Sequence, residues 1–369
     1  MASGLTPIVY EGEVEEILGR VVAEHGLHEV MLVTDAGVKA AGHTELARNS
    51  LEKAGVVVRE YDQVRPNPTD HDVQQCAAAS AGVDGFVAVG GGSCIDTAKG
   101  ASFIVTNGGS MPDYRGFGLA TKPLLPIVAV PTTAGTGSEA QSYTLISDDE
   151  THTKMACGAM GALPIVAILD ARLTLTMPRQ QTAITGLDAI VHAVESAVCT
   201  KRTQASWLLS HEAFTLLAVN LPMVLASPSD LQARRNMLRG AMLAGQAIEA
   251  SMLGAAHASA NPLTAQFDVP HGIAVATMLP HVIRYNTVDE ETASLYASLA
   301  EPLGGGPLDG HIERLLTLAD LATLQQLGVR HDAVAALASD AVEQWTGQFN
   351  PRPVNREAFI ALYQAVLGR

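Results

Sequence analysis

Four residues with metal-binding side chains stand out in the second half of the chain. Asp188 and His192 lie four positions apart inside the apolar segment 186–193, and His257 and His271 follow fourteen positions apart. One carboxylate and three imidazoles form a donor set that suits a divalent transition metal. If these side chains converge, the sequence predicts a metalloenzyme.

The spacing supports part of this set directly. Positions four apart on a helix share one face, so Asp188 and His192 are able to reach one ion. His257 is expected at the end of an apolar helix over 230–258, where an unpaired ring would be costly to bury. A lone buried histidine is more often hydrogen-bonded within a core than bound to a metal. Spacing alone therefore leaves both interpretations open.

Two glycine-rich loops in the first half suggest nucleotide binding. Segment 89–96, Val-Gly-Gly-Gly-Ser-Cys-Ile-Asp, stands where a strand should lead into a helix, and 131–139, Pro-Thr-Thr-Ala-Gly-Thr-Gly-Ser-Glu, follows another apolar strand. Glycines let the backbone approach a pyrophosphate, and free N–H groups at a helix start bind the anion. Ser93 is expected to cap that helix, with Asp96 completing a capping-box-like pair. A tight strand–helix turn would show the same glycines.

An acidic residue ends an early strand. Asp35 follows an apolar run, where a carboxylate holds ribose hydroxyls and repels a 2′-phosphate. This favours NAD over NADP. A turn aspartate without a cofactor role would look the same in the sequence.

The two halves of the chain differ in pattern. Apolar β-branched runs alternate with helical patterns up to about residue 180, which predicts a doubly wound parallel sheet buried on both faces. After Pro178 helical patterns take over. The expected strands are 30–34, 56–61, 86–89, 127–131 and 165–169, and the expected later helices are 182–199, 204–219, 230–258, 291–300, 308–319, 333–345 and 355–367. We expect an α/β Rossmann-like dinucleotide-binding domain over 1–180 and an all-helical metal-binding domain over 181–369.

Composition excludes several classes of partner. The 369 residues are 47% apolar and carry a formal net charge of −15, which disfavours binding to nucleic acid or an anionic membrane. The four cysteines form no C-x-x-C pair, and the start shows no secretory signal, so we expect reduced thiols and a cytoplasmic protein. The apolar segment 238–258 is interrupted by charged and polar residues and is expected to be a buried helix.

In its motifs the chain resembles the iron-dependent (group III) alcohol dehydrogenase family over essentially its whole length. The matching segments are Gly90-Gly91-Gly92-Ser93, the loop 131–139, Gly186-Leu187-Asp188-Ala189 with His192-Ala193, Pro270-His271-Gly272 leading to Leu279-Pro280-His281, and Asn350-Pro351-Arg352-Pro353. The resemblance implies a dinucleotide-binding domain, a helical domain, and an active site in the cleft between them. It also implies that Asp188, His192, His257 and His271 bind iron(II), with zinc as the alternative.

The resemblance further implies which residues contact the cofactor. They are Asp35, Asn67, Gly91, Gly92, Ser93, Thr132, Thr133, Ser138 and Lys154. Without the resemblance, Lys154 would be an ordinary exposed lysine in a hairpin.

The chain departs from the family pattern at positions near the expected substrate. Many relatives carry a histidine, linked to proton relay, four residues after the third ligand, where this chain has Asn261. An amide is no general base, so no catalytic residue beyond the metal ligands is expected. Gln141, Tyr143 and Ile248 stand at expected pocket positions and should shape the choice of substrate.

The resulting expectation is an enzyme that transfers hydride between NAD(H) and a small primary alcohol or aldehyde. Two alternatives share the family resemblance. One is a glycerol-type polyol dehydrogenase that prefers secondary alcohols, and the other is a lyase similar to dehydroquinate synthase, which needs a basic cluster that the sequence does not show beside the ligands. A fourth interpretation is an inactive metal-binding or filament-forming protein. A homodimer or larger homo-oligomer is expected from the apolar composition and family habit.

Overall fold

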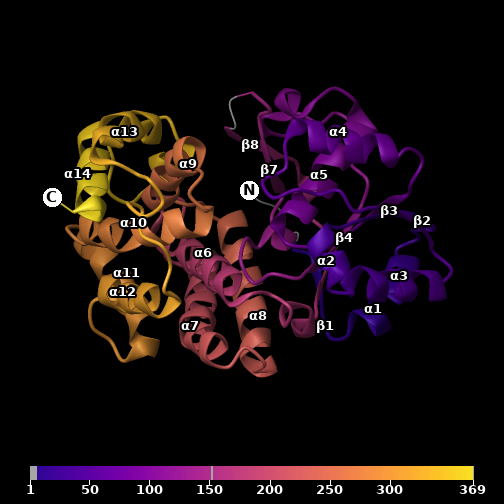
Figure 1. Ribbon diagram of the computed structural model, residues 1–369, viewed down its shortest axis with the longest axis horizontal. Coiled ribbons are helices and arrows are strands. Elements are labelled where there is room, and N and C mark those ends of the chain that lie inside the picture. The colour runs from indigo at the N-terminus through magenta and orange to yellow at the C-terminus, as the bar shows by residue number, and fades with distance from the viewer. Residues whose placement is uncertain (1–5, 151–152, 369) are drawn as a thin grey trace. The chain divides into compact units, whose positions relative to one another are not determined.

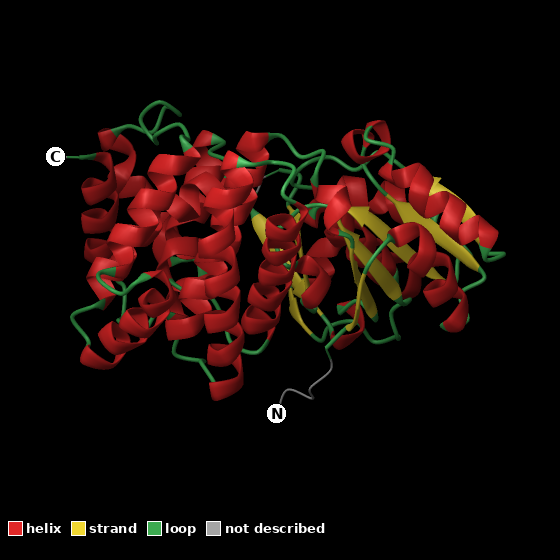
Figure 2. Ribbon diagram, turned by 90° about the horizontal axis from the view of Figure 1, so that it is seen from below, coloured by secondary structure: helices red, strands yellow, loops and turns green. Residues whose placement is uncertain are grey.

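The computed structural model describes residues 6–150 and 153–368. The chain divides into two compact units, Met1–Thr176 and Met177–Arg369. The first unit contains the strands, and the second is built from helices in the residues described (Figure 2).

The first unit is organised by a six-stranded parallel sheet with the strand order β1-β9-β6-β4-β2-β3. Its register pairs, for example, Val87 on β4 with Leu32 on one side and Val128 on the other. The strands are β1 (Ile8–Glu11), β2 (Glu29–Val33), β3 (Val57–Tyr61), β4 (Gly85–Gly90), β6 (Ile127–Pro131) and β9 (Val166–Leu169). The order places β6, β4 and β2 side by side in the middle of the sheet.

Alternate strand residues enter two separate cores. On β2, Val30 and Leu32 pack with α1 (Val14–Glu24) and α3 (His43–Lys53), while Met31 and Val33 pack with α4 (Asp70–Ala79) and α5 (Gly92–Asn107) on the other face. Because both faces are covered, the central strands carry continuous apolar runs, Val30–Val33 on β2 among them, as the sequence pattern predicted. Figure 1 shows α1 and α3 on one side of the strands and α4 on the other.

A second, three-stranded sheet completes the first unit. Its order is β5-β8-β7, with β5 (Gly116–Phe117), β7 (Tyr143–Ser147) and β8 (Lys154–Gly158), and β7 and β8 form an antiparallel hairpin. A hairpin was expected around Lys154, but the strands of this sheet and strand β1 were not among the predicted strands. These strands are short or partly exposed, so they lack the continuous apolar run that marked the central strands.

The second unit packs nine α-helices, counted over the described residues. They are α6 (Arg179–Val198), α7 (Gln204–Ala226), α8 (Leu231–Glu249), α9 (Ala255–Phe267), α10 (His271–Asn286), α11 (Glu290–Ala300), α12 (Leu308–Ala319), α13 (Val334–Val342) and α14 (Arg356–Leu367). By length and composition α7 could cross a membrane, but half of its apolar window is buried, and it packs on α6 and α8. This is the burial of a core helix.

The helices of the second unit differ from the prediction in two places. The helix expected over 230–258 is broken between Glu249 and Ala255, so His257 lies in the first turn of α9 and not at a helix end. The sequence analysis also assigned no helix to 271–286, where the structure has α10. Apolar residues run on through Met252 and Leu253, so periodicity does not reveal the break.

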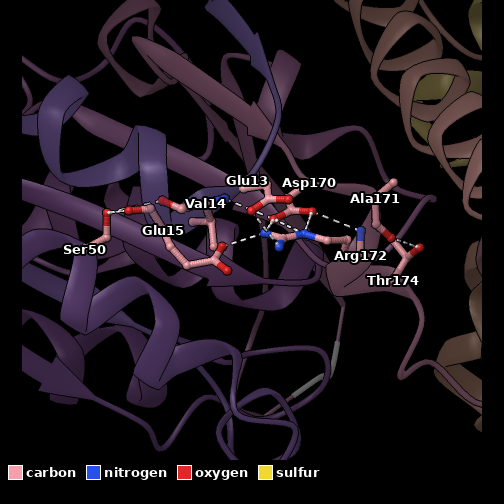
Figure 3. A network of polar contacts seen from close by, with 8 residues as sticks. All are labelled: Glu13, Val14, Glu15, Ser50, Asp170, Ala171, Arg172 and Thr174. Atoms are coloured by element: carbon pink, nitrogen blue, oxygen red, sulfur yellow. Dashed lines mark hydrogen bonds and ion pairs between the residues drawn. The ribbon is translucent and has the colours of Figure 1, made fainter.

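One ion-pair network ties the first helix to the last strand of the sheet (Figure 3). α1 has no side-chain cap of its own, and the backbone N–H of Val14 donates instead to Asp170 Oδ2 at 3.0 Å. Asp170 is buried, and it also accepts from the backbone N–H and the guanidinium of Arg172. Arg172 in turn reaches Glu13 and Glu15. Asp170 therefore caps α1 from 156 positions away.

We expect Asp170→Ala to lower the free energy of unfolding by about 2–3 kcal/mol, because it leaves the buried Val14 N–H without an acceptor. Urea denaturation followed by circular dichroism measures this change. Glu13→Ala is the matched control, since that carboxylate pairs with the same arginine from an exposed position and should change stability by less than about 1 kcal/mol. Equal losses in the two variants would contradict the capping role.

Candidate metal centre and dinucleotide site

Helix α6 carries the first two metal-ligand candidates on one buried face. Asp188 and His192 are both 6% exposed. A Cβ added to Gly186 would lie 2.8 Å from Leu221 Cδ1 on α7, so this glycine permits the close packing that buries the helix. Burial removes water from the carboxylate and the imidazole, which must then find partners within the protein or bind an ion.

Helices α9 and α10 bring the two remaining histidines to the same place. His257 lies in the first turn of α9, and His271 is the first residue of α10. A Cβ added to Gly272 would lie 2.4 Å from the carbonyl oxygen of Ile184, so only glycine lets α10 begin this close to α6. The segment Pro-His-Gly thus sets His271 against the face that carries Asp188.

The Nε2 atoms of the three predicted histidine ligands converge on Asp188 Oδ1. From this oxygen, Nε2 lies 3.6 Å away in His192 and 4.0 Å away in both His257 and His271. Two donors bound to one tetrahedral ion at about 2.1 Å lie roughly 3.4 Å apart, so the observed separations need small adjustments. In the described part of the chain, Asp188, His192 and His257 form a group whose donor atoms all lie within 4.8 Å of one another.

Two buried atoms indicate that this donor set suits a cation. Asp188 Oδ1 and His257 Nε2 are shielded from solvent and have no hydrogen-bond partner in the described residues. An unpaired buried carboxylate oxygen is costly, and a divalent metal ion offsets that cost for both atoms together. The residues present therefore fit a transition metal with nitrogen and oxygen ligands.

A further buried carboxylate supports the centre, and the sequence analysis missed it. Glu195 lies seven positions after Asp188 on the same face of α6, and its Oε2 is 2.5 Å from His257 Nδ1. The spacing Asp-x-x-x-His-x-x-Glu was a usable signal, because positions 188, 192 and 195 fall on one helical stripe. What the sequence did not show was the partner of Glu195.

Asn261, which stands where relatives were expected to carry a histidine, also makes a defined hydrogen bond. Asn261 lies on α9 one turn after His257, and its Nδ2 donates to Gln344 Oε1 at 2.9 Å. It brings no titrating group to the helix. Of the expected pocket residues, Ile248 is buried on α8, Gln141 donates to the carbonyl of Thr136, and the Tyr143 ring contacts Phe117.

The predicted dinucleotide residues gather at one edge of the parallel sheet. Asp35, Gly91 and Thr132 follow β2, β4 and β6, which are neighbours in the sheet, so the three loops emerge side by side. Ligands of such sheets bind beyond the carboxyl ends of the strands. The loop residues Gly92, Ser93 and Thr133 belong to the same edge.

Close packing explains the glycines of the first loop. A Cβ on Gly92 would lie 2.7 Å from Thr136 Oγ1, in the second loop. The prediction that Ser93 caps this helix was wrong. Helix α5 begins at Gly92, its N-cap is Gly91, and no side chain makes a cap hydrogen bond. Asp96 instead accepts from the Ser138 hydroxyl at 2.6 Å. The helix start keeps free N–H groups that suit an anion.

The other cofactor candidates have local explanations. Asp35 caps α2 (Ala36–Ala40) by accepting from the Val38 N–H at 2.9 Å, and its second oxygen accepts from the Cys94 thiol at 3.3 Å. Asn67 adopts a left-handed backbone with φ 52°, an uncommon conformation for a residue other than glycine. Lys154 is the first residue of β8 and acts electrostatically on Asp96.

A buried cation holds the second loop in place. Lys99 on α5 is 0% exposed, and its Nζ donates to the carbonyl oxygens of Ser138, Gln141 and Tyr143 at 2.7–2.8 Å and to Ser138 Oγ at 2.9 Å. The sequence analysis did not single out this lysine. Lys99 therefore ties the loop to the helix whose start forms the anion site.

Two buried acids accompany this lysine. Burial raises the pKa of Asp96, and it raises the pKa of Glu139 to about 7. The positive charge of Lys99 opposes both shifts. The loop thus rests on a buried cluster of one lysine and two carboxyl groups.

Comparison with known proteins identifies the family. The family model for iron-containing alcohol dehydrogenase matches residues 6–171, and the model for the C-terminal domain of Fe-containing alcohol dehydrogenases matches residues 182–367. The chain belongs to the iron-containing alcohol dehydrogenase family. The predicted family and the predicted fold class, an α/β dinucleotide-binding unit followed by a helical unit, are confirmed.

Several curated relatives are similar along nearly their whole length. The 1,3-propanediol dehydrogenase of Klebsiella pneumoniae is 35% identical over 92% of this chain and 91% of its own. The NAD-dependent methanol dehydrogenase of Bacillus methanolicus is 30% identical over 94% of this chain and 93% of its own. Lactaldehyde reductase of Escherichia coli (strain K12) is 33% identical over 93% of each chain.

Solved structures agree with this assignment. A crystal structure of 1,3-propanediol oxidoreductase superposes with a TM-score of 0.94 at 33% identity, over 99% of this chain and 100% of that one. An alcohol dehydrogenase from Oenococcus oeni gives 0.93 at 30% identity, over 99% and 100%. This alcohol dehydrogenase is an NAD-dependent, metal-containing oxidoreductase, with Asp188, His192 and His257 as metal ligands.

We expect Lys99→Met to weaken NADH binding and to lower the free energy of unfolding by about 3 kcal/mol or more. Methionine matches the length of lysine, but it leaves the carbonyls of the second loop and the neighbouring acids without their buried cation. Quenching of NADH fluorescence and thermal unfolding measure the two effects. Lys122→Met, at an exposed lysine, is the control. An unchanged NADH affinity in Lys99→Met would contradict the role assigned here.

Proposed function

We propose that this alcohol dehydrogenase uses NADH to reduce small aldehydes and NAD to oxidise the corresponding primary alcohols, with iron(II) as its metal. The observation that carries the proposal is the convergence of His192, His257 and His271 on the buried Asp188 Oδ1. It occurs in a chain of a family whose similar members are named for propanediol, methanol and lactaldehyde. Zinc(II) is the alternative metal.

The chemistry divides between the bound groups and the protein. A divalent metal supplies a Lewis acid for the substrate oxygen, and the nicotinamide carries the hydride. The residues of this chain orient those groups: Asp188, His192, His257 and, in this proposal, His271 hold the metal. The helix start at Gly92 holds the pyrophosphate. This proposal includes no catalytic residue beyond the metal ligands.

The proton path in this proposal does not use Asn261, which lies one turn after His257 on α9. Asn261 donates to Gln344 and has no group that titrates near neutral pH. Gln141, Tyr143 and Ile248 remain our proposed substrate-facing positions. The glycerol-type alternative would place secondary alcohols ahead of primary ones, so a panel of both classes at saturating NAD separates it.

We further propose a cytoplasmic homodimer or larger homo-oligomer. The basis is composition: 47% of the residues are apolar, and exposed apolar side chains include Leu208, Val219 and Met223 on one stretch of α7. Sedimentation equilibrium measures the number of subunits. A monomer at micromolar concentration would contradict this part of the proposal.

We expect the purified protein to hold about one divalent metal per chain, and His257→Ala and His271→Ala to retain less than about a tenth of it after dialysis against a chelator. Each substitution removes one nitrogen donor from the set around Asp188. Metal analysis by mass spectrometry and NADH-linked reduction of propionaldehyde provide the readouts. His331→Ala, at an exposed histidine, is the control. Full metal retention in His271→Ala would remove that residue from the site.

We expect Asp35→Gly and Asp35→Asn both to raise the ratio of kcat/KM for NADPH over NADH by about tenfold, or roughly 1.4 kcal/mol. Both remove a negative charge that would face a 2′-phosphate. The pair separates charge from capping, because asparagine still caps α2 and glycine has no side chain to do so. If neither variant alters the ratio, Asp35 is a capping residue alone.

A further inference from the structure

The first turn of α9, which carries His257, is held from outside the helix. The residue before it, Gly254, offers no capping side chain. The backbone N–H of Ala255 donates to Asn350 Oδ1 at 3.3 Å, and that of Ala256 donates to Glu195 Oε1 at 2.6 Å. These acceptors come from positions 95 and 61 residues away in the sequence. The helix start therefore depends on tertiary contacts.

Glu195 makes a second contact that affects the ligand itself. It is 3% exposed on α6, and its Oε2 lies 2.5 Å from His257 Nδ1. A carboxylate accepts hydrogen bonds and does not donate them, so Nδ1 carries the proton. The lone pair of the neutral ring is then on Nε2, the atom that lies 4.0 Å from Asp188 Oδ1. One buried carboxylate thus fixes both the helix start and the ring nitrogen that faces the metal.

Asn350, which accepts from the Ala255 N–H, belongs to a buried pair of asparagine side chains. Asn350 Nδ2 donates to Asn286 Oδ1 at 2.7 Å, and Asn286 Nδ2 donates to the hydroxyl of Tyr296 at 3.1 Å. Asn350 follows the 3-10 turn Trp345–Phe349, whose Phe349 ring lies 4.4 Å from the Lys201 ammonium. This explains the position of the segment Asn-Pro-Arg-Pro: its asparagine reaches back to cap the helix that carries a metal ligand.

Gly254 shows how closely the two acceptors converge. A Cβ at this position would lie 3.0 Å from Glu195 Oε1 and 3.1 Å from Asn350 Oδ1. Its φ of −143° lies outside the left-handed region, and the two nearby acceptors leave little room for a larger side chain. An added methyl group would push one or both acceptors by a few tenths of an ångström.

We propose that Glu195 is a positioning residue for the metal: it selects the tautomer of His257 and, with Asn350, fixes the helix turn from which that ring projects. The inference rests on the proposed metal centre. Hydrogen bonds from a ligand histidine to a second carboxylate orient the ring and increase its basicity, and their loss typically weakens metal binding about 10- to 100-fold.

Glu195→Gln tests the tautomer. The amide oxygen still accepts from the Ala256 N–H, but the NH₂ group then faces Nδ1 and favours the proton on Nε2, where it blocks coordination. We expect Zn(II), a redox-silent probe, to bind about 10- to 100-fold more weakly in competition with a chromophoric chelator. Glu212→Gln, which removes an exposed carboxylate from an ion pair with Arg239, should bind like the wild type.

Nuclear magnetic resonance of ¹⁵N-histidine-labelled full-length protein supplies a readout that a purely structural role would not move. The His257 signal, assigned by its loss in His257→Ala, should show a proton on Nδ1 in the wild type, with or without zinc, and a proton on Nε2 in metal-free Glu195→Gln. An unchanged tautomer together with unchanged zinc affinity would overturn the inference.

Two further outcomes remain decisive. If Glu195→Gln does not fold, Gly254→Ala replaces it, because the methyl group displaces the acceptors while their chemistry stays intact. It should weaken zinc binding several-fold, and wild-type affinity would overturn the proposal. If the wild type itself takes up no zinc or iron, the proposed metal centre fails, while the His257 tautomer still decides whether Glu195 orients the ring.

Discussion

The second unit is organised around a buried carboxylate oxygen that has no hydrogen-bond partner among the residues the structure describes. Asp188 Oδ1 lies out of reach of water and faces three imidazole nitrogens at 3.6–4.0 Å. A carboxylate in such a place is destabilising unless a positive charge is bound beside it. The packing of α6, α9 and α10 creates this place, and the family to which the chain belongs fills it with a metal.

Close helix packing is what makes the donors converge. Gly186 lets α6 lie against α7, and Gly272 lets α10 start against the backbone of Ile184. At both positions a methyl group would meet atoms at less than 3.0 Å, which side chains do not tolerate without movement. Glycines beside the ligand residues in the sequence thereby set the distances between atoms that bind the ion. Glu195 then fixes which nitrogen of His257 takes part.

The dinucleotide unit follows a different principle. Parallel strands place the loops after β2, β4 and β6 at one edge of the sheet, so Asp35, Gly91 and Thr132 become neighbours through topology alone. The loop after β6 has little regular structure and is held by the buried ammonium of Lys99. A charge in a dry interior is strongly bound by several carbonyl oxygens, and this rigidity suits a surface that must fit a cofactor.

Sequence pattern determined the features that repeat locally. Runs of apolar β-branched residues identified five of the six strands of the parallel sheet, glycines marked the phosphate loop, and the four-residue spacing placed Asp188 and His192 on one helical face. Motifs shared with the family supplied His257, His271 and the cofactor residues. Strand β1 and the bounds of β7 and β8 were not predicted, because partly exposed strands lack a continuous apolar run.

Only the tertiary structure decided which residues are hydrogen-bond partners of one another. The break before α9, the caps that Asp170 and Asn350 provide from distant positions, and the contact of Glu195 with His257 join segments 61 to 156 residues apart. No periodic pattern encodes such a contact, because a hydrogen bond depends on where two folded segments meet. The sequence thus determined which side chains were available for chemistry, and the packing of the helices decided which atoms face one another.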